Sequence, residues 1–512
     1  MGGQGHRLSA KRSARASAKA AATLICLTAA AHAVECEALR HLSLPHVAIT
    51  RAETIAPGTF QLPAGGAEVV PGFCRVHGEA RPTGDSLIHF ELWLPASGWN
   101  GRYYQLGNGG FAGGIHLPSL AAELRRANAV AATDTGHDAS PFDASWAQGH
   151  PEKIVDYGHR SLQTTAAAAN ALIEAYYAKP ARYRYFVGCS NGGRQALMAA
   201  QRYPEDWHGI LAGAPAYDWT GQLSAFAAAQ QALRRDAASW IPSVKLPAIQ
   251  RAALDSCGSS ARVADGTPGD PRACRFDPRV LRCTDAETNA CLTARQAAVL
   301  AMIQDGPFGF EATAATVEAR WARWIVNEQP RAESHLTFAE QFFRHMVFED
   351  RTWRIEAFDA RRDPDLARSK RVAGQTLGRA LDATDPDLSR FESNGGKLLM
   401  YAGWADAFIS PRAVVAYHAQ VTERMGDSRV QRFVRLFMVP GMGHCQGGDT
   451  PNAFGQSWIT PGLRDDPTHD ARRALEVWVE RGVAPGNIVA AKYEDDDPSG
   501  AVAMTATLHP WR

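Results

Sequence analysis

Apolar runs of strand length alternate with periodic helical stretches along most of the chain. Residues 87–94, LIHFELWL, alternate as a half-buried strand does, and AVAAT at 129–133 has the length of a buried strand. The alanine-rich residues 160–178 predict a helix. The full set of predicted strands is 87–94, 102–106, 129–133, 184–188, 207–214, 397–403 and 433–439, with a further helix over 194–204.

Strands that alternate with helices predict a mostly parallel sheet covered on both faces. The alternation stops between about residues 217 and 389, where helical segments predominate, and it resumes at Lys397. We therefore predict one α/β catalytic domain formed by residues 34–217 and 390–512. Residues 218–389 are predicted to be a lid inserted into that domain.

The N-terminal residues have the pattern of a secretory signal. A basic stretch precedes an apolar run from Ala20 to Ala31, and Ala31-His32-Ala33 fits a small-x-small cleavage site. The run is too short to span a bilayer, so we predict a cleaved signal peptide over residues 1–33 and a secreted or periplasmic protein. A disordered basic tail is the alternative. No other segment of the sequence is apolar enough for a transmembrane helix.

Composition and charge argue against several classes of partner. The 512 residues are 45% hydrophobic and 21% charged, and the formal net charge is +1. Neither nucleic acid nor an anionic membrane surface is therefore expected as a partner. The 17 histidines show no H-E-x-x-H or similar ligand spacing, which argues against a metal enzyme.

Cysteine usage supports export. The chain has nine cysteines, and Cys26 falls within the predicted signal, which leaves eight. An even number in an exported protein indicates disulfides, although sequence alone does not fix their pairing. Short loops favour Cys257–Cys274 and Cys283–Cys291, Cys36–Cys74 would tie the mature N-terminus to the first part of the sheet, and Cys189 and Cys445 then remain.

A glycine-flanked serine lies between a predicted strand and a predicted helix. Ser190 has Gly188 two residues before it and Gly192 two residues after it, as a nucleophile elbow requires. Such a turn exposes the Ser190 hydroxyl and places the N–H of Asn191 at a helix N-terminus, where it can face a developing oxyanion. The alternative is an ordinary strand-to-helix turn.

Polar residues follow at the ends of two later predicted strands. Asp406 lies just after residues 397–403, and His444 lies on a glycine-rich loop after residues 433–439. The chain order Ser, Asp, His is that of α/β-hydrolase triads. We therefore predict that His444 takes the Ser190 proton and that Asp406 fixes the tautomer of His444. Either residue alone would be interpreted as a solvated loop residue.

The remaining cysteines adjoin this predicted triad. Cys189 precedes Ser190, and Cys445 follows His444. If the serine and histidine are within hydrogen-bond reach, their neighbours approach the roughly 4.4–6.8 Å between Cα atoms that a disulfide needs. A Cys189–Cys445 disulfide would clamp nucleophile to base. A reactive Cys189 thiol is the alternative, and it fits an oxidising compartment poorly.

A glycine-rich loop after residues 102–106 supplies the second candidate oxyanion donor. The sequence Gly107-Asn108-Gly109-Gly110 fits the loop that provides this donor in HGGG-type motifs. We predict the backbone N–H of Gly110 as the donor, and Gly109 is nearly as suitable. A glycine turn needed only for close packing is the alternative.

With these residues placed, the chain resembles the tannase and feruloyl esterase family of α/β-hydrolases. The resemblance implies an α/β-hydrolase fold, a lid between Ser190 and Asp406, a Cys189–Cys445 disulfide, and hydrolysis of esters of aromatic acids such as gallate, ferulate or a terephthalate monoester. The matching stretches are GNGGFAGG at 107–114, ATDTGH at 132–137, GCSNGGRQALMAAQRYPEDWHGILAGAPA at 188–216, GWADAFISP at 403–411 and VPGMGHCQGG at 439–448.

Two features of that family are altered here. Its lids usually bind calcium in a loop of the form C-D-x-x-D-G-V-x-D-G, and the corresponding residues 257–266 are CGSSARVADG. Carboxylates that would supply hard oxygen ligands are therefore missing. We predict no cofactor and at most weak calcium binding, at Asp265, Val263 and Thr267. Ala402 also stands where relatives often have His, which removes a possible donor from the pocket.

The residues and the resemblance together predict a secreted serine ester hydrolase for small aromatic esters. Trp321, Trp324, Trp353 and Phe408 are candidates to line the acyl pocket. One alternative is an acyl hydrolase for aliphatic esters or peptides on the same fold, and another is an inactive binding protein. The preferred acid and the oligomeric state stay open.

Overall fold

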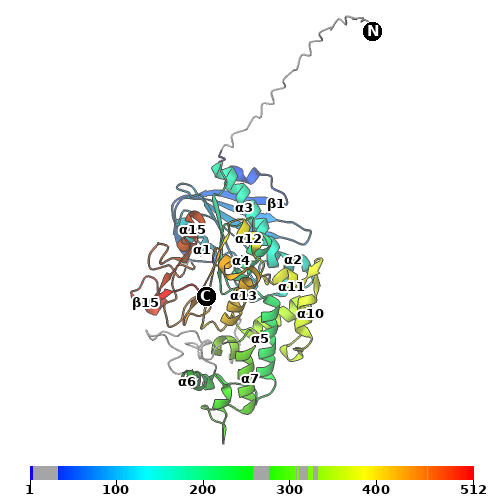
Figure 1. Ribbon diagram of the computed structural model, residues 1–512, viewed down its shortest axis with the longest axis vertical. Coiled ribbons are helices and arrows are strands. Elements are labelled where there is room, and N and C mark those ends of the chain that lie inside the picture. The colour runs from blue at the N-terminus through cyan, green and yellow to red at the C-terminus, as the bar shows by residue number, and fades with distance from the viewer. Residues whose placement is uncertain (4–32, 258–275, 307, 311–320, 327–332, 458) are drawn as a thin grey trace.

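A twisted sheet fills the upper half of the molecule in Figure 1, and a mainly helical region lies below it. Figure 1 is drawn from a computed structural model of the chain. The structure describes residues 1–3, 33–257, 276–306, 308–310, 321–326, 333–457 and 459–512. Residues 4–32, which hold most of the predicted signal peptide, lie outside the described part.

The central sheet has nine strands in the order β1-β4-β5-β7-β6-β8-β9-β12-β13. From β7 to β13 in this order neighbouring strands are parallel, whereas β1, β4, β5 and β7 pair antiparallel. This arrangement confirms the predicted α/β-hydrolase fold with a mostly parallel sheet. The strands are β1 (Val47–Ile55), β4 (Phe73–Ala80), β5 (Ile88–Pro95), β6 (Arg102–Leu106), β7 (Ala129–Thr133), β8 (Tyr183–Cys189), β9 (Gly209–Gly213), β12 (Lys397–Gly403) and β13 (Val434–Val439).

Antiparallel strands β1 and β4 extend the sheet beyond the sequence prediction. β1 buries only Ile49 and Ala52 along its length, so its apolar periodicity is weak in the sequence. The parallel strands are easier to predict because both of their faces are covered. β7 and β9, for example, are buried at every position.

Helices cover both faces of the sheet. The helices α3 (Ser161–Tyr177), α4 (Asn191–Arg202) and α13 (Pro411–Met425) pack on one face. The helices α1 (Leu117–Arg125) and α15 (Ala471–Arg481) pack on the other, where Leu124 and Trp478 join the core. Burial of these apolar side chains is the main force that holds the layers together.

The 218–389 segment, called the lid segment from here on, adds no strand to the central sheet within its described residues. Its division from the catalytic domain stays a prediction. Its helices are α5 (Trp219–Arg234), α6 (Leu246–Cys257), α7 (Ala294–Asp305), α9 (His335–Gln341), α10 (Asp363–Ser369) and α11 (Leu377–Leu381), and its hairpin is β10 (Arg371–Val372) with β11 (Gln375–Thr376). The next helix, α12 (Ser389–Ser393), begins at the last residue of the lid segment.

Short elements complete the chain around the sheet. They are β2 (Gly58–Gln61) paired with β3 (Ala67–Val70), α2 (Pro151–Val155), α14 (Asp427–Val430), and β14 (Ile488–Tyr493) paired with β15 (Val502–Leu508). Within the described residues no helix has the length and apolarity needed to cross a membrane.

Three of the four expected disulfides are present: Cys36–Cys74, Cys189–Cys445 and Cys283–Cys291. Cys36–Cys74 ties the start of the described chain to β4. The fourth expected pair includes Cys274, which lies outside the described residues.

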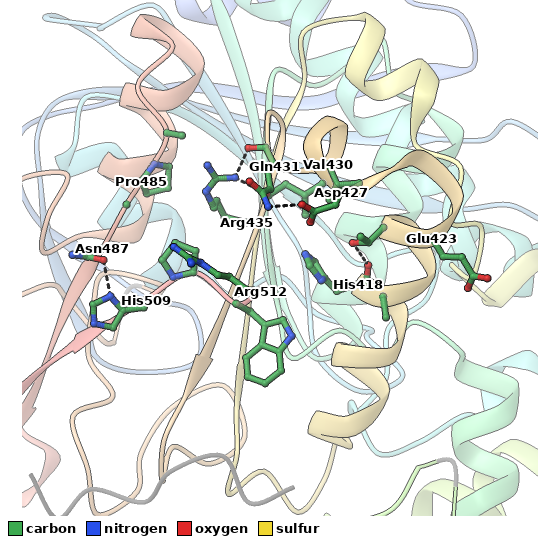
Figure 2. Close-up of a pocket in the computed structure, with 17 residues that line it drawn as sticks. His418, Glu423, Asp427, Val430, Gln431, Arg435, Pro485, Asn487, His509 and Arg512 are labelled. Atoms are coloured by element: carbon green, nitrogen blue, oxygen red, sulfur yellow. Dashed lines mark hydrogen bonds between the residues drawn. The ribbon is translucent and has the colours of Figure 1, made fainter. Parts of the chain in front are cut away.

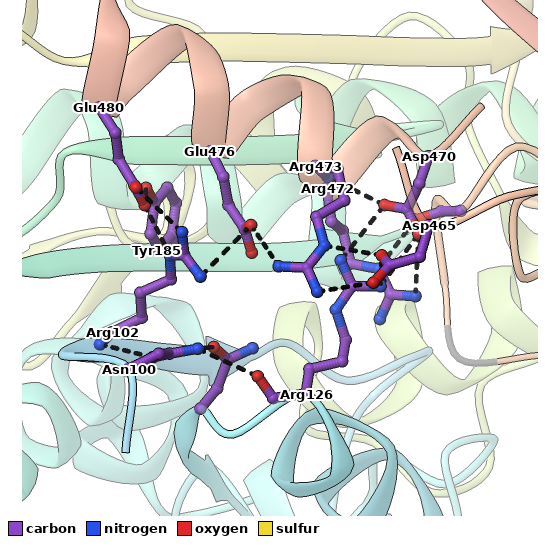
Figure 3. A network of polar contacts seen from close by, with 12 residues as sticks. Asn100, Arg102, Arg126, Tyr185, Asp465, Asp470, Arg472, Arg473, Glu476 and Glu480 are labelled. Carbon is purple, nitrogen blue, oxygen red and sulfur yellow. Dashed lines mark hydrogen bonds and ion pairs between the residues drawn. The ribbon is translucent and has the colours of Figure 1, made fainter. Parts of the chain in front are cut away.

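Buried charges attach α15 to the sheet (Figure 3). Arg472 forms an ion pair with Glu123 of α1, and both side chains are nearly fully buried, at 6% and 3% exposure. Arg102 of β6 binds Glu480, with Nε 2.6 Å from Oε1. Burying a charge is costly unless it is paired, so these contacts fix the position of α15 closely.

Candidate active site

Ser190 occupies a sharp turn between β8 and α4. Its backbone has φ 65° and ψ −124°, which is an uncommon conformation for a residue other than glycine. Its N–H donates to the carbonyl of Gly213 at 3.0 Å, which holds the turn against β9. A Cβ on Gly188 would lie 2.4 Å from the Gly192 carbonyl oxygen, so only glycine fits at that position. These features are those of a nucleophile elbow.

His444 and Asp406 form a hydrogen-bonded pair. His444 Nδ1 lies 2.8 Å from Asp406 Oδ2, and the Asp406 side chain is fully buried. The other carboxylate oxygen accepts the backbone N–H groups of Phe408 and Ile409 at 2.8 and 2.9 Å. Because Nδ1 faces the carboxylate, Nε2 is the nitrogen left to exchange a proton with a nucleophile.

The Cys189–Cys445 disulfide brings the serine and histidine loops together. Its Cα atoms are 6.0 Å apart, although the two cysteines are 256 positions apart in sequence. His444 Nε2 lies 3.8 Å from Cys445 Sγ, so the imidazole edge faces the disulfide beside Ser190. Cys189 ends β8, and Cys445 lies on the loop after β13. The disulfide therefore joins the serine and histidine loops at the carboxyl edge of the sheet.

The loop after β6 has its carbonyl groups engaged by the protein. Asn108 O accepts from Asn191 Nδ2 at 3.2 Å, Gly109 O from Ala112 N at 2.9 Å, and Gly110 O from the Tyr157 hydroxyl at 2.9 Å. In contrast, the N–H groups of Gly109 and Gly110 donate to no atom of the described residues. Both glycines therefore keep a donor for a ligand, as an oxyanion hole requires.

Gly110 also meets a strict steric demand. Its φ is 55°, and a Cβ at this position would lie 2.1 Å from the Pro141 carbonyl oxygen. Any other residue would push the loop away from Pro141. The N–H of Gly109 and the N–H of Gly110 both meet the requirement for an oxyanion donor.

Aromatic rings extend from His444 toward the lid segment. Phe408 packs edge-on against His444 with centroids 5.1 Å apart, and Phe338 of α9 contacts Phe408 at 4.9 Å. Phe111, which directly follows the glycine loop, stacks on Phe338 at 5.1 Å. These three phenylalanines, called the aromatic wall below, link the Asp406 loop, the lid segment and the glycine loop.

Only one of the four aromatic pocket candidates lies in this wall, namely Phe408. Trp353 instead stacks on Phe343 and Phe348 inside the lid segment, at 5.4 and 5.6 Å. Trp321 is buried, and the side chain of Trp324 lies outside the described part. Phe111 and Phe338 were not among the candidates, although Phe111 has a sequence signal in its position beside the glycine loop.

Two side chains of the lid segment hold the Asp406 loop. His335 Nε2 lies 2.9 Å from Ala407 O, and Gln222 Nε2 donates to Phe408 O at 3.2 Å. Burial lowers the pKa of His335 to about 3, so the ring is neutral and donates its single N–H to Ala407 O. The ring also stacks on Phe226 with centroids 3.6 Å apart. Sequence reasoning misses both contacts because they join distant segments.

A cavity of about 480 Å³ borders the nucleophile turn on the α1 and α15 side of the sheet. Its lining includes Gly109, Cys189, Tyr401, Gln456 and Arg472. Another cavity, of about 1570 Å³, lies between α13 and the C-terminal residues (Figure 2). None of the predicted triad residues lines either cavity.

No cluster of three or more metal-binding side chains occurs in the part of the chain that the structure describes. The predicted calcium residues Asp265, Val263 and Thr267 lie outside that part, so their prediction is not tested by the structure.

The fold and the elbow define the class of this protein, an α/β-hydrolase. The family model "Tannase and feruloyl esterase" matches residues 74–512, and the chain belongs to that family. An uncharacterized esterase of Xanthomonas campestris pv. campestris is 44% identical over 508 residues, which cover 94% of this chain and 88% of the relative. A probable feruloyl esterase B-2 of Aspergillus flavus is 30% identical and covers 85% of this chain and 83% of its own.

A solved structure shows the same architecture. An esterase from Aspergillus oryzae superimposes with a TM-score of 0.83 at 27% sequence identity, covering 93% of this chain and 95% of its own. The chain is therefore a carboxylic ester hydrolase, as its sequence predicts.

Proposed function

We propose that the chain is an exported serine esterase that cleaves esters of aromatic acids. Ser190, deprotonated by His444 Nε2, attacks the ester carbonyl, and the tetrahedral oxyanion accepts hydrogen bonds from the N–H groups of Asn191 and Gly110. His444 then protonates the departing alcohol. Water, deprotonated by His444, releases the acid from Ser190, and Asp406 stabilises the imidazolium in both halves of the reaction.

The observation that carries this proposal is the set of contacts around His444, namely its hydrogen bond to Asp406 and the disulfide of the next residue, Cys445. The imidazole is oriented by Asp406 at 2.8 Å, and the Cys189–Cys445 disulfide fastens its loop to that of Ser190. A binding protein without catalysis would have no need for a buried carboxylate aimed at a histidine beside an elbow serine. This arrangement favours the esterase over the inactive alternative.

The aromatic wall favours an aromatic acyl group. Phe408 packs on His444 and Phe338 packs on Phe408, with centroids 5.1 and 4.9 Å apart, so rings of the kind that pack well on an aromatic acid lie next to the imidazole. Both side chains are nearly fully buried, at 5% and 2% exposure. The name of the Aspergillus flavus relative, a probable feruloyl esterase, agrees with this choice. An acyl hydrolase for aliphatic esters or peptides is the second candidate, since aliphatic chains also pack on phenylalanine.

Export is part of the proposal. Three disulfides fit an oxidising compartment outside the cytoplasm, and the basic and apolar N-terminal pattern fits a signal peptide over residues 1–33. The mechanism uses side chains and backbone only, so no cofactor is proposed. Calorimetric titration tests the calcium prediction, because micromolar binding would contradict it.

Hydrolysis of a small panel of esters tests the function. The panel is methyl ferulate, methyl gallate, a terephthalate monoester and p-nitrophenyl butyrate, each assayed with the wild type and with Ser190→Ala. We expect cleavage of at least one aromatic ester and its loss in the variant. Cleavage of the butyrate alone would leave the triad and contradict the aromatic acid. Equal inactivity of both proteins on every ester would favour the binding protein.

A further inference from the structure

Tyr157 connects the two residues that would supply the oxyanion donors. It lies in a π-helical turn, Asp156–Arg160, between α2 and α3, and its side chain is fully buried. Its hydroxyl oxygen is 2.9 Å from Gly110 O and 3.1 Å from Asn191 Oδ1. A single O–H is thus shared between acceptors on the glycine loop and on the residue after Ser190.

Burial keeps this hydroxyl protonated. Desolvation raises the pKa of Tyr157 above its ordinary value, an effect that the nearby Arg194 guanidinium only partly offsets. The hydroxyl therefore remains a donor at neutral pH. Both of its acceptors are neutral carbonyl oxygens, so these hydrogen bonds orient the acceptor groups and involve no ion pair.

Arg194 fixes both ends of this connection. It is fully buried on α4, and its Nε donates to Asn191 Oδ1 at 2.8 Å while its NH2 group donates to Tyr157 O at 3.2 Å. Its guanidinium carbon lies 4.8 Å from the centre of the Tyr157 ring. Asn191 Oδ1 therefore receives two donors, which leaves Asn191 Nδ2 to bind Asn108 O on the glycine loop.

We propose that Tyr157 is a positioning residue for the oxyanion hole, which sets the separation between the glycine loop and Asn191. The inference rests on the proposed function, because it concerns the donors of that reaction. Gly110 has a positive φ and no Cβ, so its own side chain does not limit rotation of the loop. The Tyr157 hydroxyl holds the carbonyl of the Gly110–Phe111 peptide, whose N–H donates to Pro141 O at 2.8 Å. With both ends of that peptide held, the Gly109–Gly110 peptide before it, which carries the Gly110 N–H, has less freedom to turn.

Tyr157→Phe tests this inference, because it removes one oxygen and keeps the ring packed on Arg194. Direct removal of an oxyanion donor costs about 100- to 1000-fold in kcat, and we expect displacement of the donors to cost about tenfold, with KM nearly unchanged. The affinity for an arylboronic acid should fall in parallel. Ser190 Oγ bonds to boron in that adduct, its proton passes to His444, and a boron-bound oxygen occupies the oxyanion position.

Tyr104→Phe is the matched control. Its hydroxyl is also buried, but it donates to Glu476 on the α15 face of the sheet. We expect it to change unfolding without changing kcat or boronic acid affinity. Asn191→Ala is the second variant, because it removes the acceptor side chain and keeps the backbone N–H. Its loss should be at least as large as that of Tyr157→Phe, because it also removes the bond from Asn191 Nδ2 to Asn108 O. If Tyr157→Phe does not fold, unchanged kcat in Asn191→Ala would overturn the inference.

The inference is overturned if kcat and boronic acid affinity of the folded variants stay within about twofold of the wild type, well below the tenfold expected for displaced donors. That result would leave the proposed function intact provided Ser190→Ala is inactive. If Ser190→Ala instead kept wild-type activity, the proposed function itself would fail, and this inference with it.

Discussion

The loops at the carboxyl edge of the sheet are held by different kinds of contact on the α15 side and on the side of the lid segment. On the α15 side, Arg472 and Glu123 form a buried ion pair. Arg472 also lies beside Asp470 and Arg473 in a network of charged side chains (Figure 3). On the lid side, the Asp406 loop is held by the neutral His335 and by the aromatic wall. The first side depends on charge and therefore on pH. The second depends on packing and on a hydrogen bond whose donor does not ionise near neutral pH.

This difference separates stability from catalysis. The ion pairs attach α15 to α1 and to the sheet, and they contact no triad residue. The lid-side contacts reach the carbonyls of Ala407 and Phe408, one and two residues from Asp406. Substitutions that remove the ion pairs should therefore lower the unfolding free energy, and substitutions that remove the lid-side contacts should lower kcat.

The largest effect is expected for Arg472→Met. The variant removes the closer cation of the buried Glu123 carboxylate and leaves Arg126, whose Nε is 4.0 Å from Oε2. Breaking a buried pair costs about 3–5 kcal/mol of unfolding free energy, and we expect a loss near the lower end of that range. Denaturant unfolding at neutral pH measures the loss. Arg424→Met is the matched control, because its ion pair with Asp387 is exposed and should contribute only about 0–1 kcal/mol. Equal losses in the two variants would contradict the distinction.

The next effect is a change in pH dependence. Burial alone would raise the pKa of Glu123, but Arg472 and Arg126 outweigh it and hold the pKa below the ordinary 4.5. A lowered carboxyl pKa stabilises the fold above pH 4.5, and that contribution is lost as the pH falls through the folded-state pKa. Wild-type unfolding free energy should therefore fall on acidification.

Without Arg472, only Arg126 and Asn128 oppose the effect of burial on Glu123, so its pKa should be higher in the variant than in the wild type. The deficit of Arg472→Met should therefore shrink as the pH falls and Glu123 becomes neutral. Unfolding curves of both proteins between neutral and acidic pH measure this deficit. A deficit that stays constant over that interval would show that the Glu123 charge is not the cause.

The smallest effect is expected for His335→Phe. The substitution keeps a ring to stack on Phe226 and removes the donor to Ala407 O, a net loss of about 1 kcal/mol for a single hydrogen bond. We expect kcat to fall by a few fold because the Asp406 loop loses a support. His208→Phe is the control, since His208 accepts the N–H of Arg184 near the start of β8. It should lose similar stability with unchanged kcat.

The sequence predicts the parts of this site that depend on local pattern. Ser190 is predicted from its flanking glycines, and Asp406 and His444 are predicted from their positions after apolar strands. The Cys189–Cys445 disulfide is predicted because Cys189 adjoins Ser190 and Cys445 adjoins His444, and the structure contains this disulfide. Strand β1 is missed because its exposed polar residues hide its period.

The contacts that support the site depend on tertiary structure and leave little trace in the sequence. His335 and Gln222 lie in different helices of the lid segment, and no spacing connects them to Asp406. From the sequence, Arg194 is expected to be an exposed arginine on a helix. In the structure it is fully buried and forms no ion pair within the described residues. Among the aromatic residues, only the fold separates Phe338, beside the site, from Trp353, inside the lid segment.

Covalent labelling of the nucleophile tests the central claim most directly. An alkyl fluorophosphonate reacts with an activated serine as Oγ bonds to phosphorus and fluoride leaves, and peptide mapping by mass spectrometry locates the adduct. We predict one adduct, on Ser190, that is absent from Ser190→Ala and slowed by an aromatic ester substrate. An adduct on another residue, or equal labelling of Ser190→Ala, would contradict the assignment of Ser190 as nucleophile.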